Sequence, residues 1–251
     1  MKTAVVTGAS RGLGEAIAKQ LMDKGIQVVG VARKDSAVLP SYKGLKDAGY
    51  TYQYGDLQDT AESAITFEKL AASIFSKADD TVILVNNAGV VGPIATADAY
   101  SLDELEAHLA INLTAPMLAC SIFLKYAKKY NKPLVIVNVT SGAAERSVHG
   151  WSAYSTSKAG LNRYTETVAL EEAEAGTGNI AIAYNPGIMD TDMQADIRSS
   201  EPENFQEVQK FKDYVTNNSL RDPMFVAGVL AGILTGEHIE SGKIYAVKDY
   251  V

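Results

Sequence analysis

A tyrosine and a lysine four residues apart, Tyr154 and Lys158, have the types and spacing of an acid–base pair. On a helix, residues at positions i and i+4 lie on one face, one turn apart. A phenol titrates near pH ~10, and a neighbouring ammonium group favours the phenolate and lowers that pKa. The pair therefore predicts proton transfer at a carbonyl oxygen, with Lys158 lowering the pKa of Tyr154.

Spacing alone is weak support for this chemistry. Among 13 Tyr and 17 Lys in 251 residues, chance gives roughly one Tyr-x-x-x-Lys, and a second pair does occur at Tyr42 and Lys46. The context strengthens the first pair. Ser141 follows a run at 133–139 that predicts a strand, and its hydroxyl can donate to a carbonyl oxygen that gains charge. A serine that only forms a turn before Gly142 is the alternative.

Apolar runs rich in β-branched residues alternate with helical patterns along the chain. This alternation predicts right-handed βαβ crossovers and a parallel sheet covered on both faces. The expected fold is a single-domain α/β Rossmann fold over residues 1–251, with a doubly wound parallel sheet of about seven strands. The expected strands are 3–7, 27–32, 50–54, 81–85, 133–139, 180–184 and 243–247, and the expected helices are 15–24, 61–77, 102–129 and 152–175.

A glycine-rich turn follows the first expected strand and precedes the first expected helix. A strand, a turn and a helix N-terminus together form an anion-binding site. Gly8 would permit the tight turn, Gly12 would admit a pyrophosphate, and Gly14 would let helix and strand pack closely. The other cofactor candidates in this turn are Ser10, Arg11 and Leu13. A tight turn with no ligand is the alternative.

The residues after the second expected strand indicate which dinucleotide binds. NAD sites place an Asp or Glu there for the ribose 2′-hydroxyl, whereas this chain has Arg33 and Lys34, with Arg11 in the glycine-rich turn. Cations suit a 2′-phosphate, which arginine can bind through two hydrogen bonds. The sequence therefore predicts NADPH, and a solvated surface arginine is the alternative.

Asn112 and Pro116 interrupt the expected helix at 102–129. Proline has no N–H to bond the Asn112 carbonyl, and its ring pushes against that carbonyl. The pattern predicts a kink and a free carbonyl at Asn112. A helix that is kinked for packing alone is the alternative.

Composition excludes several classes of partner. A net charge of −7 and a pI near 5.1 argue against nucleic acid or an anionic membrane. The single cysteine, Cys120, rules out an intrachain disulfide or a thiolate metal cluster and reads as a buried, inert thiol. Apolar runs look shorter than the ~20 residues that span a bilayer. The chain enters its first strand without a signal-peptide core, so a cytoplasmic location is expected.

Several motifs recur in the order found in one family, over nearly the whole chain. These are Thr7-Gly8-x-x-x-Gly12-x-Gly14, Asn86-Asn87-Ala88-Gly89, Asn112, Ser141, Tyr154-x-x-x-Lys158 and Pro186-Gly187. Together they resemble the short-chain dehydrogenase/reductase family. Longer runs at 112–117, 141–143 and 186–200 resemble its sepiapterin-reductase-like branch, and especially the bacterial benzil reductases that form (S)-benzoin.

The resemblance implies a ketone reductase in which Tyr154 protonates the oxygen, Ser141 polarises it and Lys158 assists Tyr154. The Asn112 carbonyl would hold a water in a proton relay. Lys158 and Tyr154 would also contact the cofactor. The further cofactor contacts that the family implies are Asp56, Leu57, Asn87, Ala88, Gly89, Pro186, Gly187, Ile188 and Thr191. A homodimer or homotetramer is also implied.

The polar segment near 188–218 carries helically spaced apolar residues, and this pattern predicts either a substrate lid or a surface helix. Its candidate pocket residues are Ile188, Met189, Met193, Ile197, Phe205 and Phe211, and Trp151 either lines the same pocket or packs in the core. Arg198 and Lys212 are isolated charges. Apolar walls suit a bulky, uncharged carbonyl compound, so a 1,2-diketone such as benzil is the expected substrate.

Two other functions fit the same kind of fold. A nucleotide-sugar epimerase or dehydratase would favour a G-x-x-G-x-x-G turn and a larger C-terminal substrate domain, neither of which the sequence has. A non-catalytic NADPH-binding sensor would typically have lost the tyrosine or the lysine, and both are present here. Fold alone does not decide among these functions.

Overall fold

Seven parallel strands form one sheet in the part of the chain that the structure describes. The computed structural model describes residues 2–44, 48–77 and 80–250. The strands are β1 (Thr3–Thr7), β2 (Gln27–Ala32), β3 (Tyr50–Tyr54), β4 (Val82–Asn86), β5 (Leu134–Val139), β6 (Ile180–Asn185) and β7 (Ile244–Ala246). Their order across the sheet is β3-β2-β1-β4-β5-β6-β7. The predicted single-domain Rossmann fold is confirmed.

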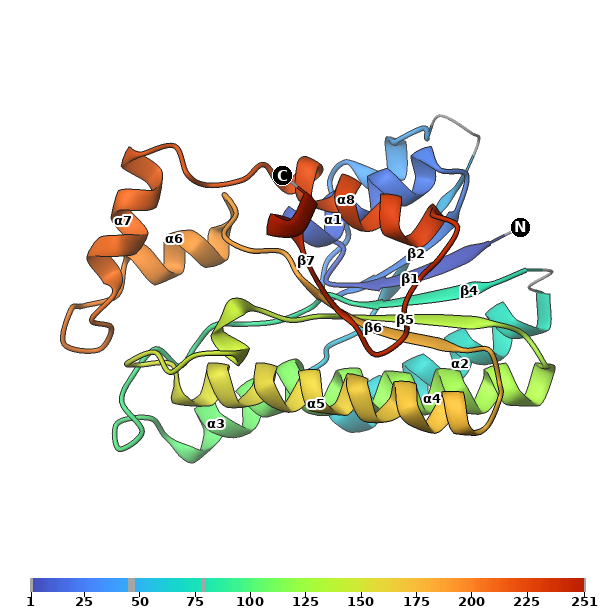
Figure 1. The fold of residues 1–251 in the computed structure, drawn as a ribbon, viewed down its shortest axis with the longest axis horizontal. Helices are drawn as coiled ribbons and strands as arrows, with labels where there is room; N and C mark the ends of the chain where they lie inside the picture. The colour runs from blue at the N-terminus through green and yellow to red at the C-terminus, as the bar shows by residue number, and fades with distance from the viewer. Residues whose placement is uncertain (1, 45–47, 78–79, 251) are drawn as a thin grey trace.

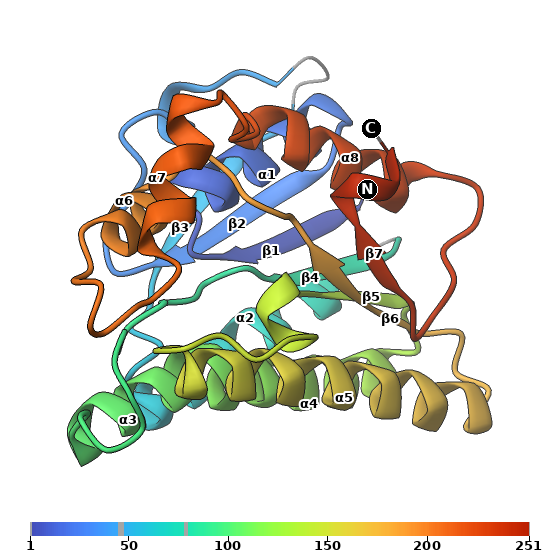
Figure 2. The same cartoon turned by 60° about the vertical axis from the view of Figure 1, so that its left-hand side comes forward.

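Helices cover both faces of the sheet (Figures 1 and 2). One face carries α1 (Gly12–Asp23) and α8 (Pro223–Thr235), and the other carries α2 (Thr60–Lys77), α4 (Ala115–Tyr130) and α5 (Ser152–Glu174). Every residue of β4 and β5 is buried, as expected of strands covered on both sides. This burial explains why these strands read as continuous apolar runs.

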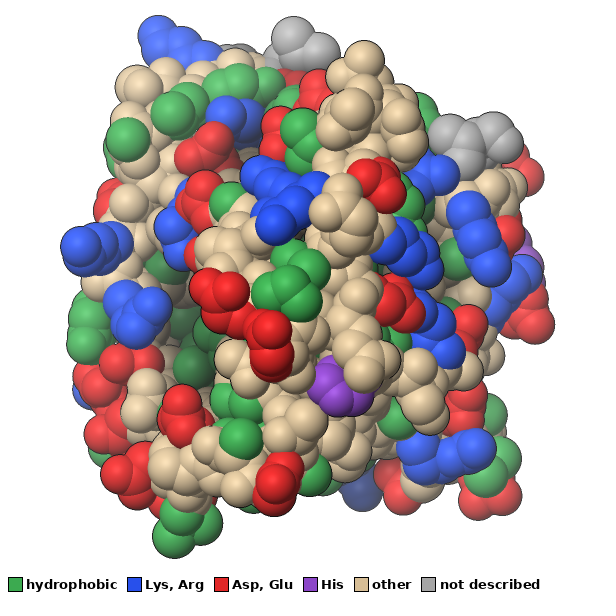
Figure 3. All heavy atoms as spheres, turned by 90° about the vertical axis from the view of Figure 1, so that its left-hand side faces the viewer, with side chains coloured by type: hydrophobic (Ala, Val, Ile, Leu, Met, Phe, Trp, Pro, Cys, Tyr) green, Lys and Arg blue, Asp and Glu red, His purple; other side chains and the backbone are tan. Residues whose placement is uncertain are grey.

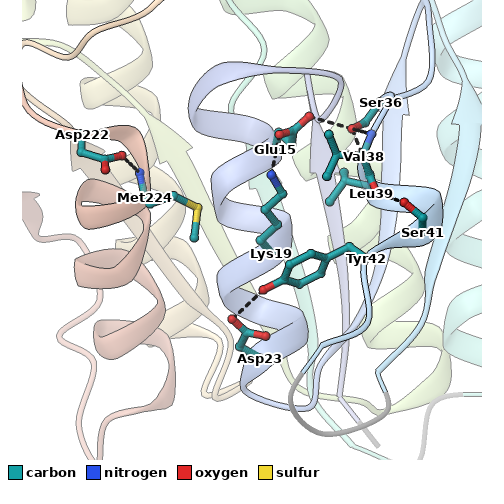
Figure 4. Close-up of polar contacts among 10 residues, drawn as sticks. All are labelled: Glu15, Lys19, Asp23, Ser36, Val38, Leu39, Ser41, Tyr42, Asp222 and Met224. Atoms are coloured by element: carbon teal, nitrogen blue, oxygen red, sulfur yellow. Dashed lines mark hydrogen bonds and ion pairs between the residues drawn. The ribbon is translucent and has the colours of Figure 1, made fainter.

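Helix α8 was missed in the sequence because its pattern is not amphipathic. Its core-facing residues Val226, Leu230 and Leu234 are buried, but apolar and glycine residues also fill its other face. Asp222 caps its N-terminus by accepting a hydrogen bond from the Met224 amide at 2.7 Å (Figure 4). Helical periodicity is a weak signal when apolar residues surround the helix axis.

The predicted kink near Asn112 is a π-helical turn. Helix α3 (Leu102–Leu109) runs into η2 (Ala110–Thr114) and then into α4. Across η2 the Ala115 amide bonds to the carbonyl of Ala110, five residues back, and Pro116 occupies the first turn of α4. Such turns relieve the strain of a residue that cannot join the regular helical bonding.

The run Leu102–Tyr130 is long and apolar enough to cross a bilayer by length and composition. The expectation that no run reaches that length was wrong, because the charged residues lie at its two ends and 107–124 carries none. Within the fold this run packs against the sheet and α2, and Ala119, Cys120 and Phe123 are fully buried there. It is a core helix of the α/β layer.

Two short helices lie beyond the carboxyl ends of the strands, α6 (Asp192–Arg198) and α7 (Val208–Thr216) (Figure 1). Short 3-10 turns occur at η1 (Leu39–Ser41), η3 (Gly142–Ala144) and η4 (Val247–Tyr250). At the same end of the sheet, β1 lies beside β4, and the connections from these strands lead to opposite faces. Open α/β sheets bind ligands at such a switch point.

Candidate active site

Three of the predicted catalytic side chains meet near the carboxyl end of β5. Tyr154 and Lys158 lie in the first two turns of α5, with the Lys158 Nζ 6.0 Å from the centroid of the Tyr154 ring. Ser141 precedes η3, and its hydroxyl is hydrogen-bonded with the Tyr154 hydroxyl. Lys46, the lysine of the second Tyr-x-x-x-Lys, lies outside the described residues.

The prediction that Lys158 lowers the pKa of Tyr154 was wrong for this structure. Burial raises the pKa of Tyr154, and its hydrogen bond with Ser141 offsets only part of that rise. Burial also lowers the pKa of Lys158 to about 8. The lysine Nζ donates to the carbonyl oxygen of Val139 at 2.9 Å. Burial is the main cause of both shifts, because it disfavours the charged form of each group.

Asn112 is fully buried and fixed by two hydrogen bonds to one residue. Its Oδ1 accepts from the Val90 amide at 2.8 Å, and its Nδ2 donates to the Val90 carbonyl at 2.7 Å. A Cβ placed on Gly89 would lie 3.2 Å from the Asn112 Oδ1 and 3.5 Å from the Lys158 Nζ. Gly89 thus lies between the asparagine and the lysine, and it places no side chain there.

The glycine-rich turn has the geometry predicted for a phosphate site. Gly8 has a φ of +68°, and a Cβ on Gly14 would lie 2.2 Å from the Gly8 carbonyl oxygen. Asn87 supports the turn by donating from Nδ2 to the Thr7 carbonyl at 2.9 Å. No side chain caps the N-terminus of α1, so its first amides are available to an anion. These residues fit a dinucleotide.

The loop after β2 holds two of the predicted 2′-phosphate ligands. Arg33 and Lys34 are exposed there, and the next turn is anchored to α1 by Ser36 (Figure 4). The Ser36 hydroxyl donates to Glu15 at 2.7 Å and accepts from the amides of Val38 and Leu39 at 3.0 and 3.1 Å. This anchoring places both cations beside the start of α1.

Arg11, the third predicted cation, forms an ion pair with Asp192 at 2.6 Å. Both side chains are exposed, and exposed pairs contribute about 0–1 kcal/mol, so a phosphate group can compete for this arginine. The pair joins the glycine-rich turn to the start of α6. Gly12 lies at the same junction, since a Cβ there would be 3.7 Å from the Thr191 Cγ2.

The remaining predicted cofactor residues follow strand ends. Asp56 and Leu57 follow β3 after Gly55, and Leu57 is buried at 9% exposure. Pro186 and Gly187 follow β6, where the Gly187 amide donates to Asn185 Oδ1 at 3.1 Å and Gly187 has a φ of +68°. Ser10 follows β1, Leu13 lies at the start of α1, Ala88 follows β4 and Ile188 follows β6. The predicted set therefore borders one end of the sheet.

A cavity of about 380 Å³ opens beside Tyr154 and Ser141. Its apolar lining includes Trp151, Ile188, Met189, Met193, Ile197 and Phe211. Phe205 does not line it but stacks on Trp151, with ring centroids 4.8 Å apart. Trp151 therefore both lines the pocket and packs in a hydrophobic cluster, which were the two alternatives considered for it. The segment 188–218 packs over the site through this aromatic cluster and is not a detached surface helix.

Charged residues at the cavity were missed because they come from outside 188–215. Glu145, Arg146, Arg221 and Lys248 contribute to its lining. Arg146 is held by Glu207 through two hydrogen bonds of 2.7 and 3.2 Å. Figure 3 shows this end of the molecule, where acidic and basic side chains are interspersed around apolar ones. The charges lie in segments that only the fold brings to the cavity.

The fold and these motifs match a known family. The family model for short chain dehydrogenase covers residues 2–202. The chain belongs to the short-chain dehydrogenase family. It is 41% identical over 251 residues to the benzil reductase ((S)-benzoin forming) of Bacillus subtilis (strain 168), covering 100% of both chains. It is 32% identical over 249 residues to the benzil reductase of Bacillus cereus, covering 99% of this chain and 100% of that one.

Solved structures of this family have the same architecture. The KRED1-Pglu enzyme is 31% identical, with a TM-score of 0.82 over 97% of this chain and 100% of that chain. Two further structures of similar fold, with TM-scores of 0.80 and 0.76, contain NAD in one case and NADP in the other. This short-chain dehydrogenase is therefore a carbonyl oxidoreductase that uses a nicotinamide cofactor, and the predicted resemblance to benzil reductases is confirmed.

Proposed function

We propose that this enzyme uses NADPH to reduce a bulky, uncharged ketone, and that its substrate is a 1,2-diketone such as benzil, which becomes the hydroxyketone. The observation that carries the proposal is the position of Tyr154 and Ser141 at the wall of a largely apolar cavity of about 380 Å³. A cavity of this size accommodates a drug-sized molecule, and apolar walls favour an uncharged one. The similarity to two bacterial benzil reductases supports the same substrate class.

The preference for NADPH rests on the charges after β2. Arg33 and Lys34 are exposed at the position where an NAD site carries an acidic residue. Ser36 and Glu15 hold the following turn against α1, so the two cations need little ordering to bind a phosphate. The pyrophosphate would lie on the amides that begin α1. When a 2′-phosphate binds, Arg11 would either break its ion pair with Asp192 or bind the phosphate while keeping that pair.

When bound, the nicotinamide supplies a hydride to the carbonyl carbon. Ser141 donates a hydrogen bond to the carbonyl oxygen as negative charge develops there. Tyr154 then gives that oxygen its proton. The raised pKa of Tyr154 keeps the phenol protonated at neutral pH, which is the form that a proton donor needs.

Lys158 supports the proton transfer from close by. With a pKa of about 8, its amine is mostly protonated at pH 7, so it stabilises the phenolate that remains after the proton leaves. Asn112 lies on the far side of Gly89 from this amine, and its carbonyl would hold the water that returns a proton to the site.

The proposal extends to the surroundings of the site. The segment 188–218 acts as the substrate lid, because Phe211 lines the cavity and Phe205 packs behind Trp151. Met189 and Met193 supply adaptable apolar contacts to the substrate. A cytoplasmic location and a homodimer or homotetramer complete the proposal, in line with the family.

Steady-state kinetics with three carbonyl substrates tests the proposal. Benzil, a pterin ketone and a small charged keto acid are each compared with NADPH and with NADH. We expect the highest kcat/KM with benzil and NADPH. A clear preference for the charged keto acid would refute the apolar-cavity assignment and leave the reductase assignment intact.

A further inference from the structure

A buried histidine that the catalytic scheme does not use lies beside the active site. His108 is 1% exposed in α3, and its Nδ1 lies 2.6 Å from the Gly92 carbonyl oxygen. Its Nε2 lies 2.9 Å from the Ser157 hydroxyl and 3.0 Å from Asn112 Nδ2. The ring thus joins α3 to the 90–92 segment, to the π-helical turn and to α5.

The neighbours of His108 decide where its proton lies. A carbonyl oxygen can only accept, so Nδ1 must carry the hydrogen that bonds to Gly92. Asn112 is oriented by its two bonds to Val90, so its amide nitrogen, with one hydrogen still free, faces Nε2. An amide nitrogen can only donate, so Nε2 must present a lone pair to Asn112, which requires a neutral ring. The single hydroxyl hydrogen of Ser157 has two acceptors within reach, the Tyr154 main-chain carbonyl and Nε2, each at 2.9 Å, and it fits this lone pair when it points to Nε2.

The same ring also contacts the proton donor. His108 meets the Tyr154 ring edge-on, with centroids 6.2 Å apart and planes at 79°. Trp151 meets the Tyr154 ring at 5.3 Å and 67°. The phenol is thus packed between His108 and Trp151, while its hydroxyl bonds with Ser141. Aromatic packing of this kind restricts the ring to one position.

We propose that His108 is a positioning residue for the reduction. It acts as a neutral ring with its proton on Nδ1 and holds the Tyr154 ring and the Asn112 side chain in fixed positions relative to each other. This inference rests on the proposed reductase function. Burial lowers the pKa of His108, and the nearby positive charge of Lys158 lowers it further, while hydrogen bonds of the ring to the backbone at Gly92 and Ala153 raise it by a smaller amount. The titratable groups that face the ring, Lys158 and Tyr154, both come from α5.

The first test compares His108→Gln and His108→Phe with the unaltered enzyme. Phenylalanine can bond neither Gly92 nor Asn112, and glutamine carries its donor and acceptor on a flexible chain in place of a rigid ring. We expect single-turnover reduction of benzil to slow by about 10-fold to 100-fold, the effect of a misplaced catalytic group, with NADPH affinity within about twofold of the unaltered value. His149→Gln and His238→Gln are matched controls, since these exposed residues are the other two histidines of the chain. Folded variants with unaltered rates would overturn the proposal.

The second test needs no substitution. Nitrogen-15 NMR of histidine-labelled enzyme reports the tautomer of each ring. We expect His108 to hold the Nδ1–H form when neutral and to become protonated only at a lower pH than an unperturbed imidazole, whose pKa is ~6.5. An Nε2–H tautomer, or protonation of His108 at a higher pH than an unperturbed imidazole, would overturn the inference. If the unaltered enzyme reduces no ketone, the proposed function fails, and the NMR result still decides the state of His108.

Discussion

Lys158→Met should make the cofactor-free protein more stable at neutral pH while abolishing its activity. The Lys158 side chain is buried at 5% exposure, and burial lowers its pKa from 10.5 to about 8. That gap, at ~1.4 kcal/mol per pKa unit, corresponds to roughly 3 kcal/mol of native-state free energy lost by burying the charge. Methionine keeps the chain length and removes the charge. The Val139 carbonyl loses its donor, at a cost of about 1 kcal/mol.

The net gain in the free energy of unfolding should therefore be about 2 kcal/mol at pH 7. The gain has a defined pH dependence because the unfolded lysine titrates near 10.5 and the folded one near 8. Between these values the unfolded chain binds more protons, so the unaltered protein gains stability as pH rises. The advantage of the variant should be constant below pH 8 and shrink between pH 8 and 10.5.

Urea unfolding followed by circular dichroism, without NADPH, measures both effects. Lys69→Met serves as the control, because Lys69 is exposed on α2 and surface changes usually stay within about 0.5 kcal/mol. A Lys158→Met protein that is less stable than the unaltered one at pH 7 would refute the reasoning. So would a stability difference that stays constant up to pH 10. Active sites often carry such destabilising groups.

Three further outcomes follow from the site. NADPH should bind at least about tenfold tighter than NADH, or ~1.4 kcal/mol, and Arg33→Asp should narrow or reverse that gap in fluorescence titrations; equal affinities in the unaltered enzyme would contradict it. Met193→Ala should lower kcat/KM for benzil by about fivefold through lost apolar contact, with NADPH affinity unchanged. Burial raises the pKa of the Cys120 thiol to about 12, so iodoacetamide at pH 8 should label it only after unfolding in urea, and labelling of the native protein would refute this burial.

Local sequence patterns were enough to predict the sheet and the tight glycine-rich turn between β1 and α1. Apolar β-branched runs specify strands buried on both faces, and no observed strand end differs from the expected one by more than one residue. Gly8 and Gly14 could be assigned roles because each role depends on neighbours close in sequence. Asn112 and Pro116 predicted a helix irregularity for the same reason, since a missing N–H acts within one turn.

Features that depend on contacts between distant segments could not be predicted. The pKa of Tyr154 is raised by burial, in a cluster with Trp151, Ile197 and Phe211 that the fold assembles from distant segments. His108 gave no signal because two of its three partners, Gly92 and Ser157, lie 16 and 49 residues away, and the third, Asn112, was considered only for its main-chain carbonyl. Helix α8 was not predicted because apolar residues surround its axis, so the sequence shows no helical periodicity there.

The most direct test of the central claim is the turnover of Tyr154→Phe with benzil and NADPH. Phenylalanine keeps the ring that packs between His108 and Trp151 and removes only the proton donor. The expected result is a loss of turnover of roughly 10²–10⁴-fold, as for a lost general acid, with NADPH affinity retained. Tyr42→Phe removes a phenol that bonds Asp23 at 2.9 Å on α1, and it should leave turnover unchanged. A Tyr154→Phe enzyme with full turnover would contradict the assignment of Tyr154 as the proton donor.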